Sequence, residues 1–263
     1  MVKRFLVRAN QKVSFGWAAT LLAGSSLLGS ALGLLRDRFL YGSFGLESSE
    51  VSAFKAAFAV PDFMFFLLIS GALSVTFIPI FNERYIKGNK KSAWELSSSL
   101  LNLFAMTTFV ASVLILIFAD PLVRYVVAPG LDEHTTFLAI SMMRIIAVNP
   151  LLFSISSVFA AMQQAVGRFF FVSLAPSFYN LSIIFGVVFL APKYGIMGVA
   201  LGVVIGAVVQ LLVSALGLAG LGFDYKPLIF WRNKGFRKLL QILPARSADQ
   251  GIDYFNNIVE VNL

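Results

Sequence analysis

Residues 195–221 read GIMGVALGVVIGAVVQLLVSALGLAGL and contain no charged side chain. The hydrocarbon core of a bilayer is about 30 Å thick, and a helix needs about 20 consecutive apolar residues to cross it. Glycine recurs in this stretch at positions 198, 202 and 206, a spacing that lets helices approach closely in lipid. The stretch therefore predicts a membrane-spanning helix that packs against a neighbouring helix.

Five further stretches meet the same requirement, which predicts six spans in all. The expected spans are Val13–Leu35, Ala53–Phe81, Trp94–Ala119, Phe137–Met162, Phe169–Ala191 and Gly195–Leu221. The first is too long for the apolar region of a secretory signal peptide, and charged residues follow it in place of a small-residue cleavage site. We therefore expect this stretch to be retained as a span.

The overall composition excludes several classes of protein. Of the 263 residues, 58% are hydrophobic and 13% are charged, and the mean hydropathy is +0.83. Soluble domains carry about 25% charged residues, and a globule of this size has too little interior to hide so much apolar surface. A soluble enzyme domain, a disordered chain and a nucleic-acid-binding module are therefore excluded.

The residue types that carry most catalytic and metal chemistry are scarce. The chain has no cysteine and a single histidine, His134, which excludes thiolate and histidine-rich metal sites. It also lacks a phosphate-cradling loop and a plausible hydrolytic triad. We expect no cofactor and no enzymatic activity.

The net charge of +8 indicates how the spans are oriented. Basic residues gather before the first expected span, between the second and third, between the fourth and fifth, and after the sixth. The opposite connections hold few of them. Because cytoplasmic loops are rich in Lys and Arg, this pattern predicts a cytoplasmic N-terminus.

Three regions follow from this arrangement. Residues 1–222 are expected to form a six-span lobe, and residues 223–243 a basic amphipathic segment on the cytoplasmic face of the membrane. Anionic lipid headgroups would attract that segment, whereas nucleic-acid binding is the less favoured reading. Residues 244–263 are interpreted as the start of a seventh span that is cut short, with a soluble amphipathic tail as the alternative.

Ionisable residues inside the spans, or at their ends, are candidates for a binding site. Burying such groups costs several kcal/mol unless they are paired or hydrated. Lys55 and Asp62 lie seven positions apart and therefore on similar faces of one helix. The alternative for Arg38, Lys55 and Arg144 is that each extends its charge to the membrane surface. The predicted substrate-binding set is Arg36, Asp37, Arg38, Lys55, Asp62 and Arg144.

Proline interrupts three of the expected spans, at Pro61, Pro79, Pro150 and Pro176. Each removes a backbone hydrogen bond and can kink its helix. Kinked helices suit a protein that opens alternately to the two sides of a membrane. Prolines are also common in transmembrane helices, so they do not establish transport alone.

Short motifs follow one another in a recognisable order along nearly the whole chain. They are Gly33-Leu-Leu-Arg36-Asp37, Phe44-Gly45, Ala53-Phe54, Val60-Pro61-Asp62, Gly71-Ala-Leu-Ser74, Phe77-Ile-Pro79, Ala128-Pro129-Gly130, Ala175-Pro176 with Asn180, and Tyr194 through Gln210. In this order they resemble the MurJ/MviN family of lipid II flippases. The resemblance implies an all-α, polytopic membrane protein: the N-terminal six-helix lobe of a MATE-like exporter fold, plus the start of a seventh helix.

The same resemblance implies a function. It predicts transfer of an undecaprenyl-pyrophosphate-linked peptidoglycan precursor across the bacterial cytoplasmic membrane by alternating access. Four positions at which the family carries charged residues hold Ser30, Ser52, Phe65 and Phe66 here. Two alternatives stay open: another exporter of the same superfamily, for polysaccharide units or drugs, and a membrane scaffold that transports nothing.

Overall fold

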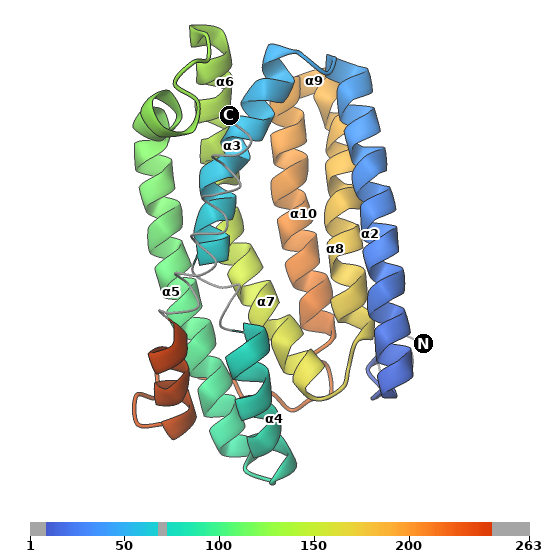
Figure 1. Ribbon diagram of the computed structural model, residues 1–263, viewed down its shortest axis with the longest axis vertical. Helices are drawn as coiled ribbons and strands as arrows, with labels where there is room; N and C mark the ends of the chain where they lie inside the picture. The colour runs from blue at the N-terminus through green and yellow to red at the C-terminus, as the bar shows by residue number, and fades with distance from the viewer. Residues whose placement is uncertain (1–8, 68–72, 244–263) are drawn as a thin grey trace.

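The computed structural model describes residues 9–67 and 73–243, and the regular elements within these ranges are helical. The long helices run side by side between the two ends of the molecule (Figure 1). The elements are α2 (Phe15–Phe44), α3 (Ser49–Phe65), η2 (Leu73–Phe77), α4 (Ile78–Ile86), α5 (Lys90–Leu122), η3 (Val123–Val127), α6 (Glu133–Ile146), α7 (Asn149–Ala165), α8 (Phe170–Phe185), η4 (Gly186–Leu190), α9 (Ala191–Tyr194) and α10 (Ile196–Leu216).

Within the described residues, five helical stretches are long and apolar enough to cross a membrane. They are Gly16–Phe44, Lys90–Val127, Glu133–Ala165, Phe170–Tyr194 and Ile196–Leu216. They correspond to the expected first, third, fourth, fifth and sixth spans, which confirms an all-α, polytopic membrane fold. The expected second span covers α3, η2 and α4 and includes residues 68–72, which lie outside the described ranges.

The first span continues beyond its expected end at Leu35, so that boundary is wrong. Helix α2 ends at Phe44, and the φ of +88° at Gly45 is a left-handed conformation that stops it. A charged triplet such as 36–38 does not break a helix, because Arg and Asp lack the special backbone geometry of glycine or proline. Arg36, Asp37 and Arg38 therefore lie within α2, about two turns before its end, and not in a loop.

Two of the four span prolines begin a new helix. Pro79 and Pro150 lie in the first turns of α4 and α7, where the missing N–H has no intrahelical partner to lose. The expected fourth span is accordingly divided between α6 and α7 at residues 147–148. Pro61 and Pro176 lie inside α3 and α8.

Helix α10 packs closely against α8 and η4 through its glycines, as the spacing predicts. A Cβ atom on Gly202 would lie 2.7 Å from the Cα of Gly186, and one on Gly198 would lie 2.5 Å from the carbonyl carbon of Leu190. Both distances are shorter than any tolerable contact, and both neighbours are backbone atoms. Backbone therefore meets backbone at this interface.

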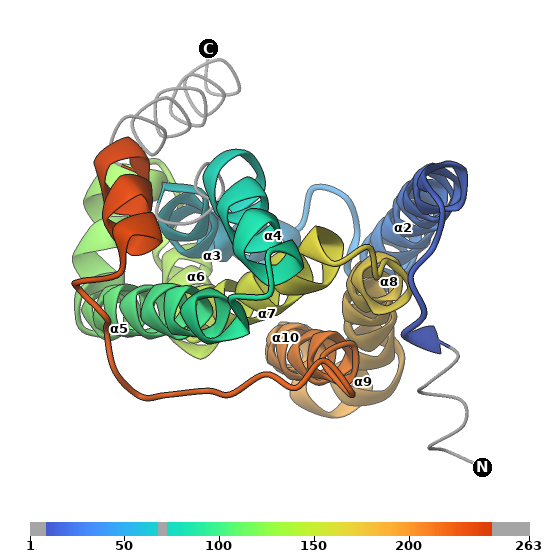
Figure 2. The same ribbon diagram turned by 90° about the horizontal axis from the view of Figure 1, so that it is seen from below.

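The chain after α10 returns beneath the bundle and packs on the first half of α5 (Figure 2). Its extended backbone is bound by polar side chains of α5. Asn102 Nδ2 donates to the carbonyls of Lys226 and Leu228 at 2.8 and 3.0 Å, and the N–H groups of Lys226 and Phe230 donate to Ser98 Oγ and Ser99 Oγ at 3.1 and 2.8 Å. Phe236 and Leu239 then enter the core beside α4 and α5. The segment is thus attached to the lobe.

Replacing Gly202 by Val is expected to destabilise the lobe. The added side chain would overlap the backbone of Gly186, which cannot rotate away, and overpacking of this kind costs about 1–3 kcal/mol. We expect a lower thermal unfolding midpoint in detergent. Gly24→Ala in α2 is the control because open space surrounds Gly24. Equal midpoints for the two variants would contradict the close contact.

Candidate functional site

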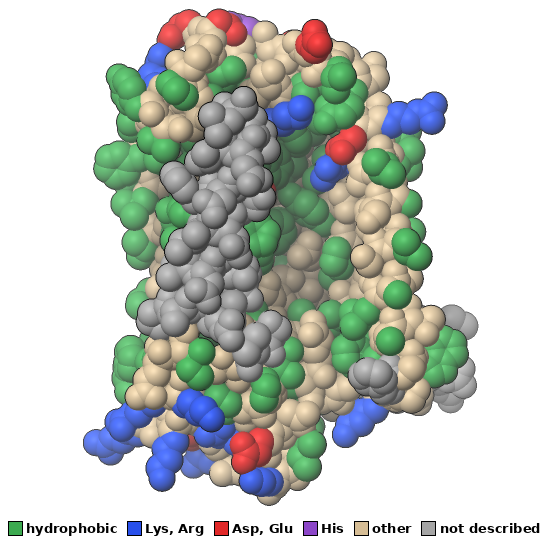
Figure 3. Space-filling view, in the orientation of Figure 1, with side chains coloured by type: hydrophobic (Ala, Val, Ile, Leu, Met, Phe, Trp, Pro, Cys, Tyr) green, Lys and Arg blue, Asp and Glu red, His purple; other side chains and the backbone are tan. Residues whose placement is uncertain are grey.

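A cavity of about 600 Å³ opens between α2, α3, α7, α8 and α10. Its lining combines charged, polar and aromatic side chains: Arg36, Phe54, Lys55, Phe58, Ala59, Asp62, Phe65, Phe66, Phe153, Tyr179 and Gln210. Figure 3 shows a hollow on this face, with Lys or Arg and Asp or Glu side chains close to its upper part. Three of the six predicted site residues, Arg36, Lys55 and Asp62, line it together.

Arg36 is held in place by two neighbours. Its Nη2 lies 2.8 Å from Asp37 Oδ1, and its Nε donates to the same oxygen at 2.9 Å. Its Nη1 donates to Asn180 Oδ1 on α8 at 3.4 Å. The guanidinium is half-buried and bridges two walls of the cavity. Asp37 therefore contributes to the site by orienting Arg36.

Lys55 and Asp62 lie on one face of α3, as their spacing predicts. The Lys55 Nζ lies 5.7 Å from the centre of the Tyr41 ring, which places the ammonium where a cation–π interaction is favourable. Within the described residues, neither Lys55 nor Asp62 forms an ion pair. The cavity therefore presents a flexible cation and a carboxylate about two helical turns apart.

An aromatic wall faces these charged groups, and we define it as Phe65, Phe153 and Tyr179. The ring centres of Phe65 and Phe153 are 5.7 Å apart, and those of Phe153 and Tyr179 are 5.2 Å apart, both edge to face. Phe153 and Tyr179 were not among the residues predicted from the sequence. Their sequence separation hides their contact, because α3, α7 and α8 meet only in the folded lobe. Gly206 was an available signal, since its missing side chain makes room for the Tyr179 ring.

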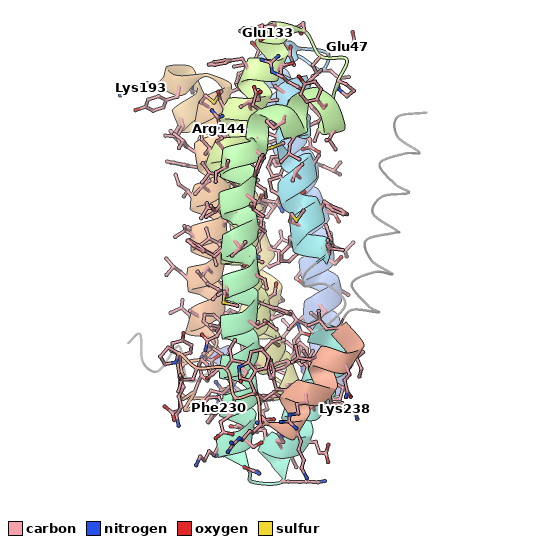
Figure 4. The ribbon with its side chains drawn as sticks, turned by 90° about the vertical axis from the view of Figure 1, so that its left-hand side faces the viewer. Glu47, Glu133, Arg144, Lys193, Phe230 and Lys238 are labelled. Carbon is pink, nitrogen blue, oxygen red and sulfur yellow. The ribbon has the colours of Figure 1, made fainter. Side chains whose placement is uncertain are left out.

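The structure places the remaining two predicted residues outside this cavity. The side chains of Arg38 on α2 and Arg144 on α6 are exposed, and neither lines the cavity. Figure 4 shows Arg144 toward the end of the molecule that carries Glu47 and Glu133. Residues two positions apart lie on nearly opposite sides of a helix, so Arg36 and Arg38 have different surroundings.

The described residues contain no group of three or more His, Cys, Asp or Glu side chains arranged to hold a metal ion. The site therefore consists of the cations Arg36 and Lys55, the carboxylate Asp62, the carboxylate Asp37 that pairs with Arg36, and the aromatic wall. Such a set can bind a charged group and a flat or ring-shaped group side by side.

Comparison with known proteins agrees with this architecture. The family model described as "Lipid II flippase MurJ" matches residues 43–263. A probable lipid II flippase MurJ of Buchnera aphidicola subsp. Acyrthosiphon pisum is 28% identical over 220 residues, covering 82% of this chain and 43% of that protein. The lipid II flippase MurJ of Burkholderia cenocepacia is 28% identical over 236 residues, covering 86% of this chain and 45% of that protein. The chain spans about half the length of these relatives.

Solved structures show the same fold. A lipid II flippase MurJ in an inward closed conformation matches with a TM-score of 0.74 and 24% identity, covering 92% of this chain and 50% of that one. A MOP superfamily transporter from Pyrococcus furiosus matches with a TM-score of 0.69 and 16% identity, covering 90% of this chain and 52% of that one. The resemblance predicted from the sequence motifs is confirmed. The chain is a multi-pass helical protein of the bacterial inner membrane, and it belongs to the MurJ family of lipid II flippases.

Proposed function

We propose that this chain forms one wall of a transport cavity for a lipid-linked peptidoglycan precursor, lipid II, and moves it between leaflets by alternating access. The observation that carries the proposal is Arg36, a cation held at the cavity between two helices by Asp37 and Asn180. The names of the family and of the matched relatives support the same activity. Transport, rather than bond-making catalysis, is the role of such a site.

Arg36 suits recognition of a pyrophosphate. A guanidinium offers five N–H donors in a planar fork that matches the spacing of phosphate oxygens. The contacts of Arg36 with Asp37 and Asn180 leave further donors for a ligand. Lys55 would add a second cation with a flexible stem. The two together would bind the charged part of a lipid-linked headgroup.

The aromatic wall suits the remainder of that headgroup. Phe65, Phe153 and Tyr179 present apolar ring surface along the cavity. The apolar face of a sugar ring packs favourably on such a surface because burial removes C–H groups from water. Phe65 occupies a position at which charged residues are expected in the family, so this lobe would hold its ligand with fewer cations and more ring contact.

Helix ends supply the places at which the lobe would bend. The α6 and α7 helices are separated at residues 147–148, and the π-helix η2 changes to the α-helix α4 beside Pro79. Movement at such transitions changes few hydrogen bonds, because Pro79 and Pro150 lie there and proline donates no backbone hydrogen bond. Alternating opening of the cavity would use these positions.

Arg36→Ala is expected to reduce transport strongly, because hydrogen bonds to charged groups contribute about 1.5–3 kcal/mol, or about 10- to 100-fold. The assay is growth and lipid II translocation in a bacterial strain depleted of its own flippase, with the variant expressed within its complete gene. Arg36→Lys should keep part of the activity, because it preserves the charge without the fork.

Lys193→Ala is the matched control, since Lys193 is an exposed cation outside the cavity. Full transport by Arg36→Ala would remove Arg36 from the mechanism. Drug resistance conferred by the wild-type chain, without any effect on lipid II, would instead support a different exporter of the superfamily.

Cysteine labelling tests whether the cavity holds water. Because the chain has no native cysteine, single replacements of Ala59, Asp62 and Gln210 can each be treated with a charged, membrane-impermeant thiol reagent. We expect all three to react, since they line the cavity.

The control for lipid exposure is Leu212→Cys, which lies on the same helix as Gln210. Leu212 is 59% exposed but does not line the cavity, so it should stay unreactive in a bilayer. If the three cavity positions were as unreactive as Leu212, a packed scaffold would describe the lobe better than a transporter.

A further inference from the structure

A second cavity, of about 760 Å³, lies at the opposite end of the lobe from Glu47 and Glu133. It is formed where the chain after α10 docks beside the end of α4 and the start of α5. Its lining residues are Arg84, Asn89, Ser92, Glu95 and residues 229–234, and it shares none of them with the first cavity. Figure 4 labels Phe230 and Lys238 near this end. We call it the tail cavity.

Arg84 is a fixed cation in the tail cavity. Its Nε donates to Ser92 Oγ and its Nη1 to the carbonyl of Ile80, both at 3.1 Å. A Cβ atom on Gly235 would lie 2.5 Å from Nη2, so the guanidinium packs directly on the backbone there. Two of its five N–H donors are used by these contacts. None of the ion pairs within the described residues includes Arg84.

Two more cations line the same cavity, and its net charge is positive. Arg232 and Lys234 come from the docked segment, and both are exposed and without an ion pair in the described part of the chain. Glu95 is the single carboxylate among the lining residues. A half-buried guanidinium without a counter-ion is costly, and three cations facing one carboxylate favour an anionic ligand.

The surroundings indicate which anion this is. Trp231 and Leu228, on the same docked segment, are 57% and 61% exposed. Tryptophan is enriched where a protein crosses the boundary between hydrocarbon and headgroups. Lys and Arg side chains gather at this end of the molecule in Figure 3, as expected for a cytoplasmic face. The ligand would therefore approach with its apolar part beside Trp231 and its charge beside Arg84.

We propose that the tail cavity binds the phosphate group of an anionic phospholipid, with Arg84 as the fixed donor and Arg232 and Lys234 as mobile ones. A free phosphate offers the same oxygens, but it would gain nothing from the exposed Trp231 and Leu228. The site rests on the fold and its orientation, and it is independent of the proposed transport of lipid II. Its test therefore measures binding alone.

The experiment uses the whole chain with Trp17→Phe and Trp94→Phe, which leaves Trp231 as the one tryptophan of three. The protein is placed in phosphatidylcholine vesicles that contain brominated phosphatidylglycerol or brominated phosphatidylcholine. We expect phosphatidylglycerol to quench Trp231 emission at a lower mole fraction. Arg232→Gln with Lys234→Gln should weaken that preference about 100-fold, since each direct hydrogen bond to a charged group contributes about tenfold, which exceeds the diffuse attraction of a cation near the surface.

The matched control is Lys91→Gln with Lys238→Gln. Both lysines are exposed and neither lines the tail cavity, so the pair removes equal charge outside the site. An equal loss of preference in both variants would overturn the site, because it would indicate diffuse attraction.

Recovery of Trp231 emission on addition of millimolar inorganic phosphate would overturn the assignment to a lipid. Arg84→Lys, which keeps the charge without the fork, should show an intermediate preference, and a preference equal to wild type would overturn the role of Arg84.

Discussion

The lobe depends on one close contact, in which the backbone of α10 meets the backbone of η4 and α8. Helices in lipid gain little from burying apolar surface, so close approach and tight packing stabilise them instead. Gly198 and Gly202 permit that approach. Gly206 extends it: a Cβ atom there would lie 2.8 Å from the Tyr179 ring. The contact thus seats Tyr179 in the cavity wall, with Gln210 one turn further along α10. Helix packing and site geometry have the same cause.

Local sequence signals predicted the elements of the fold well. Apolar length located the spans, and the seven-residue separation of Lys55 and Asp62 correctly placed both on the cavity face of α3. Signals that depend on three-dimensional contact were missed. Arg36 and Arg38 are two positions apart and chemically alike, yet only Arg36 meets Asn180 across the helix interface. Between Leu35 and Gly45 no proline ends the helix, and Gly42 stays helical within α2. The sequence alone does not distinguish such a glycine from one that ends a helix, and the charged triplet suggested an earlier end.

The cavity of this lobe is nearly balanced in charge, which shapes how it would hold an anion. Arg36 is already paired with Asp37, and Asp62 lies on the same wall as Lys55. A pyrophosphate entering here would compete with Asp37 for the guanidinium, so binding would exchange one charged contact for another. Such exchange weakens the net affinity and eases release, and a transporter needs both binding and release. Phe65 in the wall adds ring surface without adding charge.

The docked segment shows how a polar row inside an apolar span can be structural. Residues 97–99 are three consecutive serines, and Asn102 follows one turn later. In a helix facing lipid such groups would be a cost, but the backbone of residues 226–230 has no regular secondary structure and needs hydrogen-bond partners. Ser98, Ser99 and Asn102 supply them. The serine row therefore fixes the path of the chain after α10. That path brings Arg232 and Lys234 to the cavity that Arg84 also lines. Neither the sequence of α5 nor that of the docked segment predicts this arrangement alone.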